Sequence, residues 1–399
     1  MPAAPLRADS PAMASATPSD RSALTSWPPC SSLPTIGVEE EFLLVDRSTG
    51  LPVPVSGPVL GVARSIDGSS GAVLQHEVLR AQVETATPVC STLSEVVTSL
   101  QRSRRALAVA AEAHHVSLAA VGTPPDFRPD QPVTASTRYL AMRRQAPVLL
   151  DEQLVDGMHV HVAVPTRESG VRVLNHLRPY LPALLAFSAN SPFWHGRDTG
   201  FASWRGVHMQ RWPVEGAPPR FRSLEEHDRH LQTLLRTGVI MDLGMVYWQA
   251  RLSERHPTVE VRVCDVALDV ESAAAITGLV RGLVVAALAD EAAGRPSPRV
   301  SASLLRAASW QAARSGLETE LVAPDSLATG TARMEPAETV VLEVASRSAD
   351  HLGEEGGRLL ELVRSVLHHG NGARRQRTAF ADGGLPALME LVCQSPSGE

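Results

Sequence analysis

The sequence predicts an α+β fold in which an antiparallel β-sheet is backed by helices. Four separate segments alternate apolar and ionisable residues as half-buried strands do, and longer stretches between them have helical spacing. Strand and helix patterns do not alternate strictly, and the sequence contains no GxGxxG motif, which disfavours a dinucleotide-binding parallel sheet. An antiparallel sheet can keep one face open while helices cover the other.

The composition is that of a globular protein of 399 residues, with 44% hydrophobic residues, 20% charged residues and a net charge of -6. This charge disfavours a protein that mainly neutralises nucleic-acid phosphates. The sequence contains no lysine, which excludes ordinary P-loop NTPases, protein kinases and Schiff-base enzymes. Contacts with nucleotide phosphates would therefore use arginine, backbone amides and metal ions.

The first 34 residues contain seven Pro, seven Ala and seven Ser, so we expect a disordered leader there and a single folded domain over residues 35–395. The four cysteines are far apart and form no CxxC pair, which is typical of reduced thiols in a cytoplasmic protein. No uninterrupted apolar run approaches 18 residues, and the N-terminus lacks a secretory signal pattern. We therefore expect no membrane span.

The first predicted strand covers residues 35–45, TIGVEEEFLLV. Its apolar side chains lie on one face together with Glu40, and Glu39 and Glu41 lie on the other. Because a strand rises about 3.3 Å per residue, these two carboxylates are expected roughly 6.6 Å apart on one side of the sheet.

The other three predicted strands repeat this arrangement. Their ionisable or polar faces carry Arg80, Gln82 and Glu84 in residues 78–86, His159 and His161 in residues 157–164, and Glu260, Arg262 and Cys264 in residues 258–266. Helices are predicted over residues 91–115, 173–190, 222–237 and about 270–293, and over most of the last hundred residues.

The four strands together would form one acidic face. Carboxylates about 5 Å apart repel by roughly 3 kcal/mol per pair at an effective dielectric near 20, so such a cluster requires cations. Oxygen-rich ligand sets with one imidazole favour Mg²⁺ or Mn²⁺ over Zn²⁺. The alternative is a solvated sheet face, on which alternating Glu and Arg are ordinary.

A second unusual stretch, residues 187–221, holds seven of the 16 aromatic residues, interleaved with arginines. A long aromatic and arginine-rich loop at the mouth of a sheet often binds substrate. Arg197, Asp198 and Arg205 are the predicted substrate contacts. Alternatively, the loop fills the core with its aromatic side chains.

A third stretch, residues 368–377, reads HHGNGARRQR. Its three arginines could contact phosphate or carboxylate. The alternative is a helix start with a solvated basic face, in which Asn371 caps the helix.

Several segments resemble the YbdK-type carboxylate–amine ligases, the glutamate–cysteine ligase type 2 family. These segments are GVEEEF at 37–42, VETATP at 83–88, GMHVHV at 157–162, ANSPFWHGRDTGFASWR at 189–205, PTVEVRVCDV at 257–266, SWQAARSGL at 309–317 and GNGARRQR at 370–377. The resemblance covers about residues 35–382 in the same order. It implies a glutamine-synthetase-like fold, with an antiparallel sheet curved into an active-site funnel, and a single ligase catalytic domain.

The resemblance also implies a reaction. An enzyme of this type joins a carboxylate, usually the γ-carboxylate of glutamate, to an amine, usually that of cysteine. ATP is the co-substrate, Mg²⁺ or Mn²⁺ is the cofactor, and an acyl phosphate is the intermediate. Further expectations are a cytoplasmic enzyme without nucleic-acid or membrane partners, which can form a homo-oligomer.

By similarity, five glutamates are expected to bind metal: Glu39, Glu41, Glu84, Glu260 and, as a further candidate, Glu77. His159 would face the phosphates and metal, and Arg262 would stabilise the transferred phosphoryl group, because its guanidinium is planar and always charged. His161 and Arg374 are expected to contact the nucleotide.

Three departures from the family pattern bear on the substrates more than on the reaction. Ala163 follows the HVHV run, YWQARLS carries Gln249 and Leu252, and Ser309 precedes Trp310. Two other functions stay open. One is a metal-dependent hydrolase that uses the histidines of the HVH pair, and the other is a non-catalytic homologue that binds nucleotide or amino acid.

Overall fold

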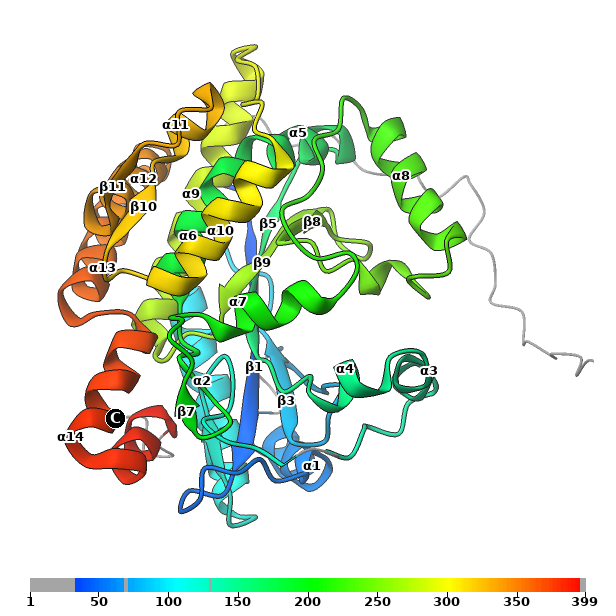
Figure 1. Cartoon of the computed structure of the whole chain (residues 1–399), viewed down its shortest axis with the longest axis vertical. Helices are drawn as coiled ribbons and strands as arrows, with labels where there is room; N and C mark the ends of the chain where they lie inside the picture. The colour runs from blue at the N-terminus through cyan, green and yellow to red at the C-terminus, as the bar shows by residue number, and fades with distance from the viewer. Residues whose placement is uncertain (1–32, 68–70, 129–130, 395–399) are drawn as a thin grey trace, which may run out of the picture. The chain divides into compact units, whose positions relative to one another are not determined.

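The computed structural model describes residues 33–67, 71–128 and 131–394 (Figure 1). The predicted disordered leader lies outside these residues except for its last two positions. The boundary expected near residue 34 therefore stays a prediction. From Leu33 onward the chain forms one compact unit.

A seven-stranded antiparallel sheet forms the centre of the fold, in the order β2-β3-β1-β5-β9-β8, and β4 also pairs with β1. The strands are β1 (Ile36–Val45), β2 (Val73–His76), β3 (Gln82–Ala86), β4 (Ser117–Ala119), β5 (Gly157–Ala163), β8 (Ala250–Leu252) and β9 (Thr258–Asp265). The predicted antiparallel α+β architecture is confirmed. The prediction missed β2, β4 and β8, which have only three or four residues and so show too little alternation to detect.

The strand predicted over residues 78–86 begins too early. In the structure residues 77–81 form the turn between β2 and β3, and the strand starts at Gln82. Ser56 N donates to the carbonyl oxygen of Arg80, which ties this turn to the start of α1, and Leu44 N of β1 donates to the carbonyl oxygen of Ala81.

The register between strands decides which side chains share a face, because directly opposed residues project from the same side. Glu41 of β1 lies opposite Glu84 of β3, and Glu39 lies opposite His159 of β5. His161 in turn lies opposite Glu260 of β9. These six side chains therefore occupy one face of the sheet, as their alternation predicted.

A β-bulge on β9 changes the alternation near its end. Between the pairs Met158–Cys264 and Val160–Val261 the register slips, because β9 has one more residue than β5 there. Cys264 therefore shares the core face with Met158, and both side chains are fully buried in the same hydrophobic cluster. Its predicted place on the open face is wrong.

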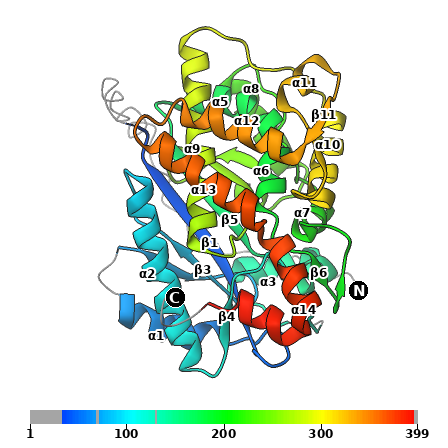
Figure 2. The ribbon, with the colours of Figure 1, turned by 90° about the vertical axis from the view of Figure 1, so that its left-hand side faces the viewer.

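Helices cover the apolar face of the sheet (Figure 2). The α-helices of the described residues are α1 (Ser56–Asp67), α2 (Leu93–Glu112), α3 (Thr137–Gln145), α4 (Pro147–Asp151), α5 (Arg167–Leu177), α6 (Leu181–Ser188), α7 (Trp204–His208), α8 (Leu224–Arg236), α9 (Val270–Ala292), α10 (Ala302–Ser315), α11 (Pro324–Thr329), α12 (Ala337–Ala349), α13 (Glu355–His369) and α14 (Gly372–Val392), of which α2 and α9 lie over the apolar face. Two small hairpins lie outside the main sheet: β6 (Phe193–Trp194) with β7 (Arg197–Asp198), and β10 (Glu320–Val322) with β11 (Met334–Pro336).

Three of the four helices predicted with bounds, α2, α8 and α9, start within two residues of the expected position, whereas α1, α3 and α4 were not predicted. Thr92 caps α2 and Asn371 caps α14, each accepting a hydrogen bond from a backbone N–H three residues ahead. The helix predicted over residues 173–190 is instead divided into α5 and α6 by a turn that contains Pro179.

Helix α9 is long and apolar enough to span a membrane by length and composition alone. However, 78% of its most apolar window is buried inside the protein. It is therefore the central helix of the core, packed against α5, α12 and α13.

A buried ion pair joins the apolar face of the sheet to α2. Arg104 Nε donates to Glu40 Oε2 at 3.0 Å, and the same arginine also reaches Gln394 Oε1 at 3.2 Å. Gln394 N in turn donates to the carbonyl oxygen of Leu118 in β4 at 2.8 Å. The last described residues of the chain are thus hydrogen-bonded to the central sheet.

Candidate active site

Glu39 is at the centre of the acidic face. Two groups of side chains have ligand atoms within 4.8 Å of one another: Glu39, Glu84 and His159 form one, and Glu39, His161 and Glu260 form the other. Each group contains two carboxylates and one imidazole, so oxygen ligands outnumber nitrogen. The two predicted histidines fall in different groups and share only Glu39.

The two histidines hold Glu39 in its charged form. His159 Nδ1 lies 2.9 Å from Glu39 Oε2, and His161 Nε2 lies 3.4 Å from Glu39 Oε1. Burial alone would raise the pKa of Glu39, but these two contacts outweigh it and lower the pKa well below its ordinary value. Burial, followed by the charge of Arg262, lowers the pKa of His159, so its imidazole is neutral near pH 7.

Two arginines hold the carboxylate of Glu260. Arg251 Nε donates to Glu260 Oε2 at 2.8 Å, and Arg262 Nη1 donates to Glu260 Oε1. Arg262 Nη1 also lies 3.3 Å from His159 Nδ1. Although burial opposes it, the pKa of Glu260 is lowered by the charges of the two arginines. Arg262 thus links Glu260 to the other ligand group.

Glu77 and Glu84 lack enough nearby positive charge to favour their ionised forms. Burial and the charge of Glu41 raise the pKa of Glu77 to about 8, and burial together with three neighbouring glutamates raises the pKa of Glu84. Glu41 Oε2 accepts a hydrogen bond from Gly157 N at 2.6 Å. Glu41 and Glu77, both predicted metal ligands, lie outside the two ligand groups, but their charges are among the causes that raise the pKa of Glu84.

This set of donors fits a divalent cation. Carboxylate oxygens with one imidazole in each group are ligands that suit Mg²⁺ and Mn²⁺. A cation would also supply the positive charge that the raised pKa values of Glu77 and Glu84 show to be lacking. A solvated face, the alternative considered from sequence, does not describe His159 and Glu260, which are only 3% and 2% exposed.

The aromatic stretch contributes one arginine to this region. Arg205 is buried at the start of α7, and its guanidinium donates to the carbonyl oxygens of Arg262 at 3.2 Å and Val263 at 3.4 Å. It also packs flat against the backbone of Gly157, where an added Cβ would lie 2.3 Å from Arg205 Nη2. Both residues therefore lie beside the acidic face.

The other predicted contacts have different surroundings. Arg197 and Asp198 are exposed on β7, and Asp198 forms an ion pair with Arg377 of α14 at 2.7 Å. Arg374 is half-exposed and lies 3.8 Å from Glu318. None of these three side chains has a described contact with the two ligand groups, so their roles in binding stay predictions.

Most aromatic side chains of this stretch fill the core, as the alternative interpretation held. Phe193 and Trp194 are buried in a cluster with Phe127. The segment that follows, from Ser203 onward, places Arg205 beside the acidic face. The stretch therefore combines a packing role with the placement of Arg205.

A buried hydrogen-bond network fixes this segment. Asp265, at the end of β9, accepts from Asn190 N at 2.8 Å, Ser191 Oγ at 2.7 Å and Ser203 Oγ at 2.9 Å. Gln376 of α14 donates to Asn190 Oδ1 at 2.6 Å. The motif residues around 190 and 376 thus have structural contacts that position α7 and its arginine.

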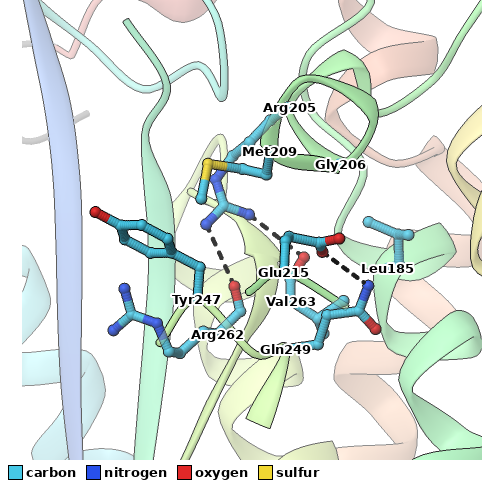
Figure 3. A pocket seen from close by; sticks show the side chains of 9 residues that line it. All are labelled: Leu185, Arg205, Gly206, Met209, Glu215, Tyr247, Gln249, Arg262 and Val263. Atoms are coloured by element: carbon cyan, nitrogen blue, oxygen red, sulfur yellow. Dashed lines mark hydrogen bonds between the residues drawn. The ribbon is translucent and has the colours of Figure 1, made fainter. Parts of the chain in front are cut away.

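A small cavity lies beside Arg262 (Figure 3). Its volume is about 30 Å³, and its lining residues are Leu185, Arg205, Gly206, Met209, Glu215, Tyr247, Gln249, Arg262 and Val263. Gln249 Nε2 donates to Glu215 Oε1 at 3.2 Å. Burial raises the pKa of Glu215 to about 7, against the opposing effect of that hydrogen bond.

Sequence reasoning missed Arg251, Glu215 and Gln249 as site residues. Each lies in a segment that had drawn attention for another reason: Glu215 follows the aromatic motif, and the other two belong to YWQARLS. The three-residue strand β8 places Arg251 opposite Glu260. This strand pairing, which cannot be recognised in so short a strand from sequence, is what brings Arg251 into the site.

The family model and the curated relatives that match this chain point to the same protein family. The family model described as Glutamate-cysteine ligase family 2 (GCS2) matches residues 35–394. A relative from Nocardia farcinica (strain IFM 10152), named "Putative glutamate--cysteine ligase 2-1", is 42% identical over 360 residues, which cover 89% of this chain and 91% of the relative.

Solved structures share the fold at low sequence identity. A glutamate–cysteine ligase from Francisella tularensis, in complex with AMP, has a TM-score of 0.66 at 10% identity, over 91% of this chain and 88% of that one. A bifunctional glutathione synthetase from Pasteurella multocida has a TM-score of 0.64 at 15% identity, over 90% of this chain and 52% of that one. The fold expected from the sequence resemblance is the fold of these proteins.

Proposed function

Because the chain belongs to glutamate–cysteine ligase family 2, we propose that it is an ATP-dependent carboxylate–amine ligase that forms a γ-glutamyl amide. The acid substrate is glutamate, and the amine is cysteine or another small amine. The observation that carries this proposal is the pair of ligand groups that share Glu39 next to Arg262.

The divalent cations of this reaction would be Mg²⁺ or Mn²⁺, held by Glu39, Glu84, Glu260, His159 and His161 with Glu41 and Glu77 nearby. They would offset the charge of the ATP phosphates. This ligand set supports Mg²⁺ over a hydrolytic Zn²⁺, because the histidines of the HVH pair do not fall in one ligand group.

The chain's own residues would orient and stabilise the reacting groups. Arg262 presents a permanent positive charge beside His159, where it would stabilise the phosphoryl group in transfer. Arg251 holds Glu260 from the other side and so fixes the carboxylate that positions Arg262. The neutral imidazole of His159 can accept a hydrogen bond without repelling a cation.

The reaction balances in two steps. An oxygen of the glutamate γ-carboxylate attacks the γ-phosphorus of ATP, and ADP leaves. The amine then attacks the acyl carbon, phosphate leaves, and the nitrogen loses a proton. The Francisella tularensis neighbour in complex with AMP supports a nucleotide site in this fold.

Phosphate release tests the proposal. We expect release from ATP and Mg²⁺ only when glutamate and one member of a panel of amines, including cysteine, are both present. Glu39→Gln should abolish it, and Glu225→Gln, on an exposed helix face, should not. No release with any acid, despite bound ATP, would favour the non-catalytic binding protein. Hydrolysis of an amide substrate that requires Zn²⁺ and no ATP would favour the metal-dependent hydrolase.

The enzyme is proposed to act in the cytoplasm without nucleic-acid or membrane partners, and to be able to form a homo-oligomer. The net charge of -6 supports the proposal that nucleic acid is not a partner, and the burial of α9 supports the proposal that the membrane is not one. Size-exclusion chromatography with light scattering would give the oligomeric state directly.

A further inference from the structure

Two buried polar atoms beside the acidic face have no partner among the described residues. They are Arg205 Nε and Gln249 Oε1. Their residues are only 6% and 7% exposed, and both line the cavity next to Arg262. A buried donor or acceptor without a partner costs free energy, so such atoms are usually satisfied by a water or a ligand. Both atoms belong to residues that line one cavity, so one buried donor and one buried acceptor lack a partner beside it.

The cavity also carries two opposite charges. Arg205 supplies a guanidinium, whose Nη1 lies 3.8 Å from Asp265 Oδ1, and Glu215 supplies a carboxyl group. No ion pair between Arg205 and Glu215 is found in the described part of the chain. Burial raises the pKa of Glu215 to about 7, and the hydrogen bond from Gln249 and the charges of Arg205 and Arg306 offset only part of that effect, so a cationic ligand group would favour its charged form. The lining thus complements a ligand that bears both a negative and a positive group.

We propose that this cavity binds the α-carboxylate and α-ammonium groups of the glutamate substrate. Arg205 Nε donates to the α-carboxylate, and Glu215 with Gln249 Oε1 accepts from the α-ammonium. This inference rests on the proposed ligase function, and it assigns the non-reacting end of the substrate to named residues.

The position of Arg262 explains why the substrate would be glutamate. Arg262 lines the cavity, and its Nη1 lies 3.3 Å from His159 Nδ1 in the ligand group of Glu39 and Glu84. A substrate with its α-groups in the cavity would therefore direct a side-chain carboxylate past Arg262 toward the proposed metal ligands. Leu185 and Met209 provide apolar contact for its methylene groups.

The size of the cavity sets a condition on binding. A volume of about 30 Å³ holds about one water, so the α-groups must displace water and widen the space. Met209, which lines the cavity (Figure 3), is suited to this, because its flexible side chain can change rotamer once the weak hydrogen bond from Gln153 Nε2 to its sulfur, at 3.3 Å, is broken.

The test compares three acids that differ only at the α-carbon. Glutamate has both α-groups, glutarate lacks the ammonium, and 4-aminobutyrate lacks the α-carboxylate. Phosphate release would be measured with each acid, at saturating ATP and amine, for the wild type, Glu215→Gln, Gln249→Leu and the matched control Glu225→Gln. Circular dichroism would verify that each variant is folded.

We expect Glu215→Gln to raise the KM for glutamate by about 10- to 100-fold, the effect of losing a hydrogen bond to a charged group. The KM for glutarate should change by less than about 3-fold, because glutarate has no group that contacts Glu215. Gln249→Leu should act in the same direction, and Glu225→Gln should behave as the wild type. Equal losses with glutamate and glutarate, or no loss with either, would overturn the inference.

Calorimetric titration separates this inference from the proposed reaction. If the wild type releases no phosphate with any acid, the ligase proposal fails, but glutamate binding can still be measured. Weaker binding of glutamate to Glu215→Gln than to the wild type would then support the site. Equal affinity, or no binding to the wild type, would overturn it.

Discussion

The contact between Gly157 and Arg205 gives a prediction whose size follows from the structure. A Cβ at position 157 would lie 2.3 Å from Arg205 Nη2 and 2.8 Å from Cζ, whereas ordinary contacts begin near about 3.5 Å. The guanidinium must therefore move by about 1 Å in Gly157→Ala. Such a movement breaks its hydrogen bonds to the carbonyl oxygens of Arg262 and Val263.

Two effects follow from this displacement. Overpacking of a buried contact costs about 1–3 kcal/mol, so the free energy of unfolding should fall by that amount while the protein stays folded. A displacement of about 1 Å in a substrate-binding group can lower kcat/KM by about 100-fold. We expect a loss of this order for glutamate, because Arg205 is the proposed partner of its α-carboxylate.

Gly37→Ala is the matched control, because Gly37 lies in the neighbouring strand β1 and an added Cβ would have its nearest contact at 3.9 Å from His161. That variant should be as stable as the wild type, or more stable by about 0.4–1 kcal/mol. Urea denaturation and steady-state kinetics would be measured for both variants. Equal stability and equal kcat/KM in the two would refute the close packing of Arg205 against Gly157.

Three further predictions concern the acidic face. Glu39→Gln should weaken Mn²⁺ binding by at least about 10-fold in calorimetry, because Glu39 belongs to both ligand groups, and unchanged affinity would exclude these groups as the metal site. Arg262→Lys should lower kcat by about 100-fold with a much smaller change in the KM for ATP, whereas equal effects on both would assign Arg262 to binding alone. The metal-free protein should lose stability between pH 6.5 and 8, because folded Glu77, with a pKa of about 8, keeps a proton that the unfolded chain releases above its ordinary value of 4.5. For one such group the free energy of unfolding falls by about 1.4 kcal/mol per pH unit, and denaturation curves at several pH values should show a shallower fall for Glu77→Gln. Histidines whose pKa is lowered in the folded protein act in the opposite direction only below about pH 6.5.

Much of the acidic face could be predicted from the sequence because strand alternation is a local property. Glu39, Glu41 and His159 follow the two-residue period of long strands, so their common face needs no knowledge of distant contacts. The resemblance to a known family then ordered these strands into one sheet. Both sources depend on continuous segments of sequence.

The remaining features depend on contacts between segments that are distant in sequence. The bulge that turns Cys264 into the core depends on how β9 pairs with β5, and the extra residue leaves no mark in the sequence. The cavity brings Arg205, Glu215 and Gln249 together from three segments, and no spacing rule relates them. For the same reason the exposed positions of Arg197 and Arg374 could not be read from their arginine-rich surroundings.

The attachment of the chain's end to the central sheet has a consequence for synthesis. Arg104 and Gln394 are 290 positions apart, and Asn190, which helps to hold the segment that carries Arg205, receives a hydrogen bond from Gln376. A nascent chain on the ribosome therefore lacks partners for buried groups of its sheet until residues 376–394 have emerged. Contacts over such separations form slowly, so the domain should acquire its active conformation only after that point, and removal of residues 376–394 should abolish folding of the whole domain.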